Sequence, residues 1–200
     1  MSYSLGINTA SSHTTLILLR DSEIIAAEYW KSANDEAEKL MPTIQNMLSE
    51  ISYEEIKRIY VVKGPGSFTG LRVGVTVANT LAYLTGAELH AFSTFEYWQA
   101  QSDLPIVVFA GKEAVYFNGE VVSLSEISEI PAAKVFGDLS EEQISAFGDR
   151  YVAHDGRWCE QLLSAITKIK TTPVKIVQPL YVKAPGITPA KLVSIISPQF

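Results

Sequence analysis

One short stretch combines residue types and spacing that could do chemistry, and it reads Gly64-Pro65-Gly66-Ser67-Phe68-Thr69-Gly70. An apolar run precedes this stretch and a run with helical spacing follows it, so we expect a strand, a tight loop and a helix. The N–H groups at the start of such a helix can bind phosphate. The Walker A pattern, however, needs a lysine at the end of the loop, and the dinucleotide pattern needs a glycine where Thr69 stands. The loop therefore matches neither common phosphate-binding pattern.

A purely structural turn is the other interpretation of this stretch. Three glycines, Gly64, Gly66 and Gly70, would let the backbone turn sharply or approach another segment closely. Pro65 fixes its own φ angle and should stiffen the turn. Ser67 and Thr69 could cap the first N–H groups of the helix, and both interpretations stay open at this point.

The histidines and the cysteine show no spacing typical of a metal site. His13, His90 and His154 lie far apart in the sequence, and we interpret each as a surface or structural residue. Cys159 falls in a predicted helix and is interpreted as a small buried hydrophobe. It forms the one local nucleophile–base pair with His154, and the predicted helix start between them disfavours a productive geometry. A peptidase therefore stays an alternative that a zinc assay and a protease screen would decide.

The elements around the loop predict a mixed α/β unit. Three strand-like runs open the chain, a helix follows, and the loop stands between a strand and a second helix that Gly86 should end. The expected strands are residues 5–7, 14–19, 24–29, 59–63 and 88–92, and the expected helices start at Asn34-Asp35 and at Leu71. Three antiparallel strands followed by helix, strand, helix and strand are the order of the ribonuclease H-like unit, which is half of the actin-like architecture.

A second, less regular set of elements follows residue 100. A helix with a capping box at residues 93–100 should bridge to a new meander, whose hairpin is marked by Asn118-Gly119. The remaining expected elements are strands at 105–110, 114–117, 120–124, 134–136 and 151–153 and helices at 140–146 and 158–168. We therefore predict a two-lobed actin-like, ribonuclease H-like α/β fold, with residues 1–100 as the first lobe. Residues 101–200 would be a trimmed second lobe with a carboxy-terminal tail.

The helix from Leu71 to Leu84 carries two apolar stripes at helical spacing, whereas a surface helix needs only one. The second stripe should cover another helix of this chain or a partner chain. Because monomers rarely expose a contiguous apolar patch, we expect this helix and the helix around residues 40–48 to pair with a partner, or with a second copy in a two-fold homodimer. The predicted interface residues are Leu40, Ile44, Met47, Arg72, Val73, Thr76, Val77, Thr80 and Leu81.

Composition places the chain among cytoplasmic globular proteins. Apolar residues make up 47% of the chain, which is enough for a large core, and no apolar run is long enough to span a membrane. The first residues do not resemble a secretion signal, and a single cysteine fits a reducing compartment. The net charge of −6 gives no general attraction to nucleic acid.

The stretch Gly64–Gly74, which reads GPGSFTGLRVG, resembles the signature of the bacterial TsaB (YeaZ) family, and we call residues 64–70 the signature loop. Residues 5–10, 39–42 and 179–183 resemble other segments of that family, so the resemblance spans nearly the whole chain. It implies a non-catalytic subunit of the system that makes threonylcarbamoyladenosine beside the tRNA anticodon. In that family TsaB pairs with the catalytic subunit TsaD through first-lobe helices, an ATPase called TsaE joins the pair, and TsaC supplies the threonylcarbamoyl-adenylate.

Three positions depart from the catalytic relatives. Metal-binding relatives carry two histidines four apart on the first helix, whereas this helix has Glu36, Glu38 and Lys39. Actin-like ATPases place a carboxylate in the first turn, where this chain has Asn8, and in the matching turn of the second lobe, where Phe109-Ala110-Gly111-Lys112 supplies none. We therefore expect no catalytic, cofactor-binding or metal-binding residue. A small actin-like ATPase or kinase is the remaining alternative, which tight Mg-ATP binding would support.

Charge is distributed unevenly along the chain. After Glu160 there are five lysines and no acid, so the last forty residues carry +5 while the first 160 carry −11. We predict that Lys168, Lys170 and Lys183 lie near tRNA in the assembled complex, the alternative being a solvated face.

Overall fold

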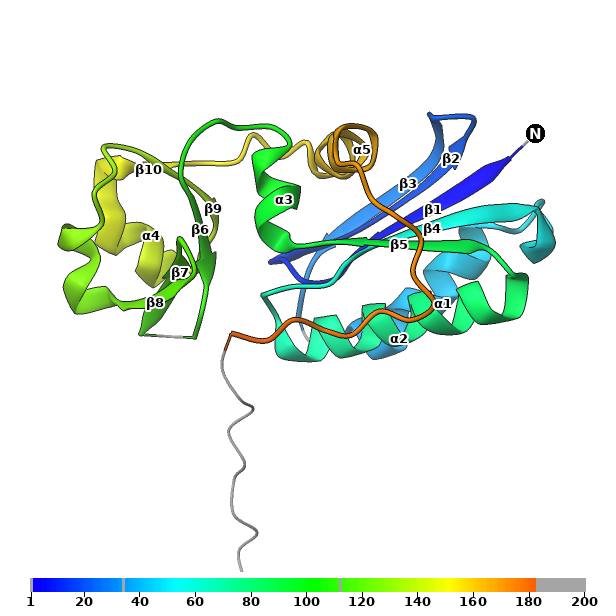
Figure 1. The fold of residues 1–200 in the computed structure, drawn as a ribbon, viewed down its shortest axis with the longest axis horizontal. Coiled ribbons are helices and arrows are strands. Elements are labelled where there is room, and N and C mark those ends of the chain that lie inside the picture. Colours follow the sequence, from blue (N-terminus) through cyan, green and yellow to red (C-terminus); the bar gives the residue numbers. More distant parts are fainter. Residues whose placement is uncertain (1, 34, 112, 183–200) are drawn as a thin grey trace, which may run out of the picture.

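Two five-stranded mixed sheets, one in each lobe, organise the chain in a computed structural model that describes residues 2–33, 35–111 and 113–182 (Figure 1). This arrangement confirms the two-lobed α/β architecture expected from the sequence. The expected helix cap at Asn34, the turn residue Lys112 and the predicted tRNA contact of Lys183 lie outside the described residues.

The sheet of the first lobe has the strand order β3-β2-β1-β4-β5. β1, β2 and β3 form an antiparallel meander, and β4 and β5 run parallel to β1. β2 is buried over most of its length because helices cover both faces of the sheet. The strands are β1 (Tyr3–Asn8), β2 (His13–Arg20), β3 (Glu23–Lys31), β4 (Ile56–Val62) and β5 (Glu88–Phe92).

Helices α1 (Glu36–Met47) and α2 (Phe68–Thr85) lie side by side on one face of this sheet (Figure 1). At the start of α2 the hydroxyl oxygen of Ser67 accepts a hydrogen bond of 3.2 Å from the N–H of Gly70. At its end Gly86 has a left-handed φ of +70°, which confirms the predicted stop. The stripe of α2 that is buried in the core consists of Leu71, Val75, Ala78 and Ala82.

The second sheet, of order β10-β9-β6-β7-β8, has the same connectivity as the first. Its first strand again lies at the centre, with a meander on one side and two parallel strands on the other. A short 3₁₀ helix, η2 (Leu124–Glu129), stands where the first lobe has α1, so the second lobe is a trimmed copy of the same topology. The elements are β6 (Ile106–Phe109), β7 (Ala114–Phe117), β8 (Glu120–Ser123), β9 (Val135–Asp138), α4 (Glu141–Phe147) and β10 (Tyr151–Val152).

The chain returns to the first lobe after β10. Helix α5 (Trp158–Lys168) packs on the second face of the first sheet, against β1 and β2 (Figure 1). Gly6 allows this contact, because a Cβ there would lie 2.8 Å from the side chain of Ile166. Residues 170–182, which we call the strap, then cross β5 and run along α2. The division into domains at residue 100 stays a prediction. Helix α5 contacts β1, β2 and β3 of the first sheet, and the strap contacts β5 and α2.

Aromatic rings fill the junction of the two lobes. Trp98 of α3 (Thr94–Gln99) meets the ring of Phe136 edge-on at 5.3 Å. Trp158 lies between two histidine rings, His13 at 4.1 Å and His154 at 4.0 Å between ring centroids. The lobes are therefore packed against each other through a shared apolar cluster. The remaining short elements are η1 (Tyr53–Glu55) and η3 (Gly148–Arg150), and within the described residues no helix has the length and apolar character needed to cross a bilayer.

Candidate functional site

The signature loop joins β4 to α2 and packs against the turn of residues 8–11 between β1 and β2. The N–H of Ser67 donates to the carbonyl oxygen of Ala10 at 2.9 Å, and the hydroxyl of Thr9 donates to the carbonyl oxygen of Gly70 at 2.7 Å. A Cβ on Gly70 would lie 2.0 Å from the backbone oxygen of Thr9. Glycine is therefore required at Gly70 for close packing between two segments of the chain.

Gly66 and Pro65 also serve the shape of the loop. A Cβ on Gly66 would lie 2.1 Å from the backbone oxygen of Ala10, so this glycine too permits a close approach between two backbones. Pro65 is buried, and the peptide bond that joins it to Gly64 is cis. Neither Pro65 nor Gly66 lines the cleft between the lobes that is described below.

The seven residues predicted together as the signature loop thus divide into two groups. Those that line the cleft are Ser67, Phe68 and Thr69, at the start of α2. Those that shape the turn and lie away from the cleft lining are Gly64, Pro65, Gly66 and Gly70. Of the two predicted caps, Ser67 accepts the Gly70 N–H, whereas Thr69 is exposed.

Two further segments hold the same loop. The N–H of Thr94, at the start of α3, donates to the carbonyl oxygen of Gly64 at 2.8 Å. The N–H of Leu180, in the strap, donates to the carbonyl oxygen of Lys63 at 2.7 Å. Four regions of the sequence therefore meet at the loop: β1–β2, α2, α3 and the strap. The structural interpretation of the loop, left open by its sequence, is supported by these contacts.

Asn8 occupies the position at which actin-like ATPases place a carboxylate, and its amide is fully buried. Its Oδ1 accepts the N–H of Ala10 at 3.0 Å, and its Nδ2 donates to the hydroxyl of Ser11 at 3.0 Å. Both ends of the amide are thus used to fix the turn of residues 8–11. A neutral amide held in this way cannot act as a general base.

A cleft with a volume of about 410 Å³ lies between the lobes. Hydroxyl groups from both lobes surround it, and among the described residues that line it Lys31 is the one cation and Asp138 the one carboxylate. Its lining residues are Ala10, Ser11, Ser12, Lys31, Ser32, Ser67, Phe68, Thr69, Phe109, Asp138, Leu139 and Ser140.

Asp138, at the end of β9, is the charged group of the cleft with the strongest bearing on its chemistry, and it was not among the predicted site residues. The stretch Phe109-Ala110-Gly111-Lys112 contains no acidic residue in its sequence, but the neighbouring strand β9 ends in a carboxylate, Asp138. Oδ2 of Asp138 accepts the N–H of Ser12 at 2.7 Å, and burial raises the pKa of the Asp138 carboxyl. The signal available in the sequence was an aspartate directly after a short apolar strand.

The first turn of α1 does not form a metal site. Glu36 is fully buried, and its Oε1 accepts hydrogen bonds from the hydroxyls of Thr14 (3.3 Å) and Ser32. These bonds join α1 to β2 and to the end of β3. Over the parts of the chain that the structure describes, no three His, Cys, Asp or Glu side chains come together as metal ligands.

Cys159 and His154 do not form a peptidase dyad. Burial raises the pKa of the Cys159 thiol to about 11, which keeps it protonated and a poor nucleophile at neutral pH. The His154 ring is stacked on Trp158, and its Nδ1 accepts the N–H of Gly156 at 3.0 Å. The peptidase alternative therefore has no support from the geometry of this pair.

The predicted interface on α1 and α2 is partly corrected by burial. Leu40 and Ile44 are 0% exposed and Leu81 is 4% exposed, so these three predicted interface residues are buried within the chain and present no surface to a partner. They are buried because α1 and α2 pack against each other. The second apolar stripe of α2 therefore covers another helix of this chain, which was one of the two possibilities that the sequence left open. Of the other predicted residues, Met47, Val73 and Val77 are half-buried against the core, whereas Arg72, Thr76 and Thr80 are exposed.

The exposed apolar residues of α2 lie at the two ends of the helix. Tyr83 is 87% exposed and Leu84 is 71% exposed at the carboxy-terminal end, and Phe68 is 36% exposed at the amino-terminal end. Leu84 is the predicted end of the helix, and neither Phe68 nor Tyr83 is among the predicted interface residues. An exposed surface therefore exists on α2, with polar residues in the middle and aromatic rings at the ends.

Two packed lobes of equal topology around a cleft define a protein of the actin-like, ribonuclease H-like class. Residues 31–144 match the family model described as TsaD, tRNA N6-adenosine threonylcarbamoyltransferase. The chain therefore belongs to this family, and its curated relatives confirm the TsaB (YeaZ) assignment within it.

Two curated relatives are named "tRNA threonylcarbamoyladenosine biosynthesis protein TsaB". The Bacillus subtilis protein is 33% identical over 94 residues, which cover 46% of this chain and 41% of the relative. The Escherichia coli protein is 33% identical over 87 residues, which cover 42% of this chain and 36% of the relative. The matched region thus spans about two fifths of the length of these relatives.

A solved structure shows the same fold over nearly the whole chain. It is an uncharacterized Pseudomonas aeruginosa protein with similarity to peptidase YeaZ, with a TM-score of 0.68 and 21% identity. The match covers 92% of this chain and 100% of that one. At this identity the similarity concerns the fold, and it confirms the predicted fold class.

Proposed function

We propose that this chain is a non-catalytic subunit that pairs with a TsaD-type catalytic subunit in threonylcarbamoyl modification of tRNA adenosine. The observation that carries the proposal is the buried Asn8 amide, whose oxygen and nitrogen both form hydrogen bonds within its own turn, where a catalytic relative needs a carboxylate. The proposed reaction, threonylcarbamoyl transfer to tRNA adenosine, is that of the family to which the chain belongs. The proposed process, threonylcarbamoyladenosine biosynthesis, is the one for which the curated relatives are named.

The exposed surface of α2 is the proposed docking face. Arg72, Thr76 and Thr80 lie on it, with the half-buried Val73 and Val77 beside them. A TsaE-type ATPase would join the pair, and the free chain would form a homodimer through the same face. The assembly would work in the cytoplasm, and the subunit itself would hold no cofactor.

Reconstitution tests the proposal. The purified chain should form a stable complex with the TsaD homologue of the same genome, and tRNA modification by the reconstituted system should require it. The isolated chain should neither hydrolyse ATP nor transfer threonylcarbamoyl. Turnover by the isolated chain that is lost on mutating a residue within it would contradict the proposal.

Asp138 keeps one alternative open, a small actin-like ATPase or kinase. A carboxylate at the cleft could order a metal ion or a phosphate-bound water, as ATPases of this class require. Tight Mg-ATP binding that is lost in Asp138→Asn would favour this alternative. Absence of binding by the intact chain would exclude it.

A further inference from the structure

Arg72, in the first turns of α2, is exposed and yet held in place by two aromatic side chains. Its guanidinium carbon lies 4.0 Å from the centre of the Phe68 ring, and its Nε donates to the hydroxyl of Tyr181 at 3.3 Å. The rings of Phe68 and Tyr181 are themselves 5.0 Å apart. Stacking and a hydrogen bond together restrict a side chain that would otherwise lose much entropy on binding.

Tyr181 reaches Arg72 because the strap is fixed along the whole of α2. The N–H of Val174 donates to the carbonyl oxygen of Leu89 at 2.8 Å, at the far end of the helix. In the middle the Asn79 amide makes two hydrogen bonds to the backbone of Val177, of 2.9 and 2.8 Å. The position of Tyr181 is therefore set by contacts that are independent of Arg72 itself.

The charge on Arg72 has no partner within the described part of the chain. Arg72 is the one charged residue between Phe68 and Thr85, and none of the ion pairs among the described residues includes it. Only its Nε has a hydrogen-bond partner in that part of the chain, which leaves both Nη groups able to bind a carboxylate. Arginine and aromatic residues are the types that most often dominate binding energy at interfaces.

We propose that Arg72, oriented by Phe68 and Tyr181, anchors a carboxylate of the protein partner that docks on α2. This inference rests on the proposed function and adds the chemistry of the contact. A guanidinium binds a carboxylate through two parallel hydrogen bonds, which fixes register as well as affinity. A second copy of the chain is the poorer occupant, since the exposed surface of α2 offers Arg72 no carboxylate in a two-fold pairing. Tyr181 is a positioning residue that acts through Arg72.

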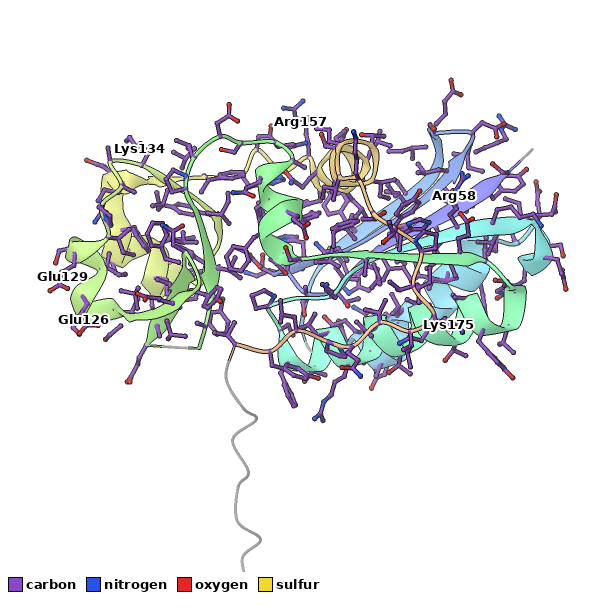
Figure 2. The ribbon with its side chains drawn as sticks, in the orientation of Figure 1. Arg58, Glu126, Glu129, Lys134, Arg157 and Lys175 are labelled. Atoms are coloured by element: carbon purple, nitrogen blue, oxygen red, sulfur yellow. The ribbon has the colours of Figure 1, made fainter. Side chains whose placement is uncertain are left out.

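The test is calorimetric titration of the TsaD homologue of the same genome with the full-length chain and its variants. Arg72→Ala should weaken binding by about tenfold or more, and Arg72→Lys should restore only part of the affinity, because an ammonium is not bidentate. Binding of Arg72→Ala should also depend less on salt concentration. Lys175→Ala is the matched control, because it removes an exposed strap cation that lies farther along α2 (Figure 2).

Tyr181→Phe keeps the ring and removes only the hydroxyl, so it separates positioning from packing. It should weaken binding severalfold in the wild-type background and have no further effect in the Arg72→Ala background. Equal effects in both backgrounds, or no effect in the wild-type background, would overturn the role of Tyr181.

The outcomes distinguish this inference from the proposed function. If Thr76→Glu abolishes binding while Arg72→Ala binds like the wild type, the anchor is wrong and the docking face stands. If the wild-type chain does not bind the TsaD homologue, both the proposed function and the anchor are wrong. Thermal unfolding of each variant shows whether it is folded, and Arg72→Lys retains the stem and the charge if Arg72→Ala is unstable.

Discussion

The N–H of Ser12 donates a hydrogen bond of 2.7 Å to Oδ2 of Asp138, and this bond joins the β1–β2 turn of one lobe to the end of β9 in the other. Asp138 is 9% exposed, and burial raises the pKa of its carboxyl while the bond to Ser12 lowers it. The net shift is upward, so the desolvation cost exceeds the gain from the hydrogen bond. The cleft therefore keeps a carboxylate at a cost in stability.

Asp138→Asn should raise the free energy of unfolding at pH 7. An acid whose pKa is raised in the folded state stabilises the fold below its unfolded pKa, and this contribution is lost as pH rises through the folded value. Asparagine retains an acceptor for Ser12 and removes the charge. The variant and the wild type should therefore differ less in their free energy of unfolding, measured with urea, as the pH falls towards about 4.

Asp103→Asn is the control, because Asp103 is exposed and should show no such effect. A variant at Asp138 that is less stable than the wild type at pH 7 would contradict the expectation. Such a result would mean that the charge-assisted bond to Ser12 outweighs the cost of burial.

Acidification should destabilise the stack in which Trp158 lies between His13 and His154. Burial lowers the pKa of both histidines, with Lys31 adding to the effect on His13 and Asp155 opposing it on His154. A histidine with a lowered pKa binds its proton more tightly in the unfolded chain, so stability falls as pH drops below about 6.5.

The measurement is the free energy of unfolding between about pH 7.5 and 5.5, on either side of the ordinary histidine pKa. His13→Phe and His154→Phe keep a ring against Trp158 but cannot titrate, so each variant should show a shallower loss of stability than the wild type. An unchanged slope in both variants would show that other groups carry the pH dependence.

Gly70→Ala should disrupt the packing of the signature loop. The added Cβ would meet the backbone oxygen of Thr9, which no side-chain rotation can move away. Overpacking of this kind costs about 1–3 kcal/mol. Ser67→Ala, which removes only the cap on the Gly70 N–H, should cost about 1 kcal/mol. Chemical denaturation compares the two, and a Gly70→Ala variant as stable as Ser67→Ala would contradict the close-packing argument.

Most of the fold follows from local patterns. The meander of β1 to β3, the stop of α2 at Gly86 and the Asn118-Gly119 hairpin are determined by alternation and turn residues close in sequence, and all three were predicted. The placement of α5 on the first sheet was not, because it depends on the space that Gly6 leaves on a distant strand. A helix pattern shows which face is apolar but not which sheet it will cover.

The candidate site was harder to predict because it too depends on contacts between residues that are distant in the sequence. The signature loop was found from its residue pattern, but its contacts with Thr9 and Leu180 are long-range. The close approach of Gly66 to Ala10 is equally invisible in the sequence. Asp138 was missed because its role depends on the parallel pairing of β9 with β6, which sets its place beside the cleft.

Leu81 was assigned to the wrong surface because two apolar stripes fit a buried helix pair as well as a partner interface. The helical spacing of apolar residues shows that both sides of α2 are apolar. It does not show whether the second side packs against α1 or against another chain. Arg72 and Thr76, which were predicted as interface residues, are exposed on α2, and their part in an interface stays a prediction.

Lys170 is the better of the two described lysines for testing contact with tRNA. The ammonium of Lys168 donates to the carbonyl oxygen of Ala100 at 2.6 Å, whereas Lys170 is exposed at the start of the strap. Lys170→Gln should reduce the slope of log affinity against log salt by about one unit for the assembled complex. Lys57→Gln serves as control, because Lys57 lies in β4 and its ammonium donates to the carbonyl oxygen of its neighbour Glu54. An unchanged slope in Lys170→Gln would mean that Lys170 is simply solvated.

Thr76→Glu is the sharpest test of the docking face on α2. Val77 is half-buried against the core, so a charge there would destabilise the monomer and confuse loss of binding with loss of folding. Thr76 is exposed one residue earlier, where glutamate should leave the free energy of unfolding within about 0.5 kcal/mol of the wild type. In a complex the added carboxylate would lie in the interface one turn from Arg72, where it would compete for the guanidinium and add a charge and bulk between the partners. It should therefore abolish both the TsaD pair and the homodimer. Light scattering after size exclusion measures both assemblies, and Glu38→Gln on the exposed side of α1 controls for a change in charge alone. A Thr76→Glu variant that still forms the pair would place the interface on another surface of the first lobe.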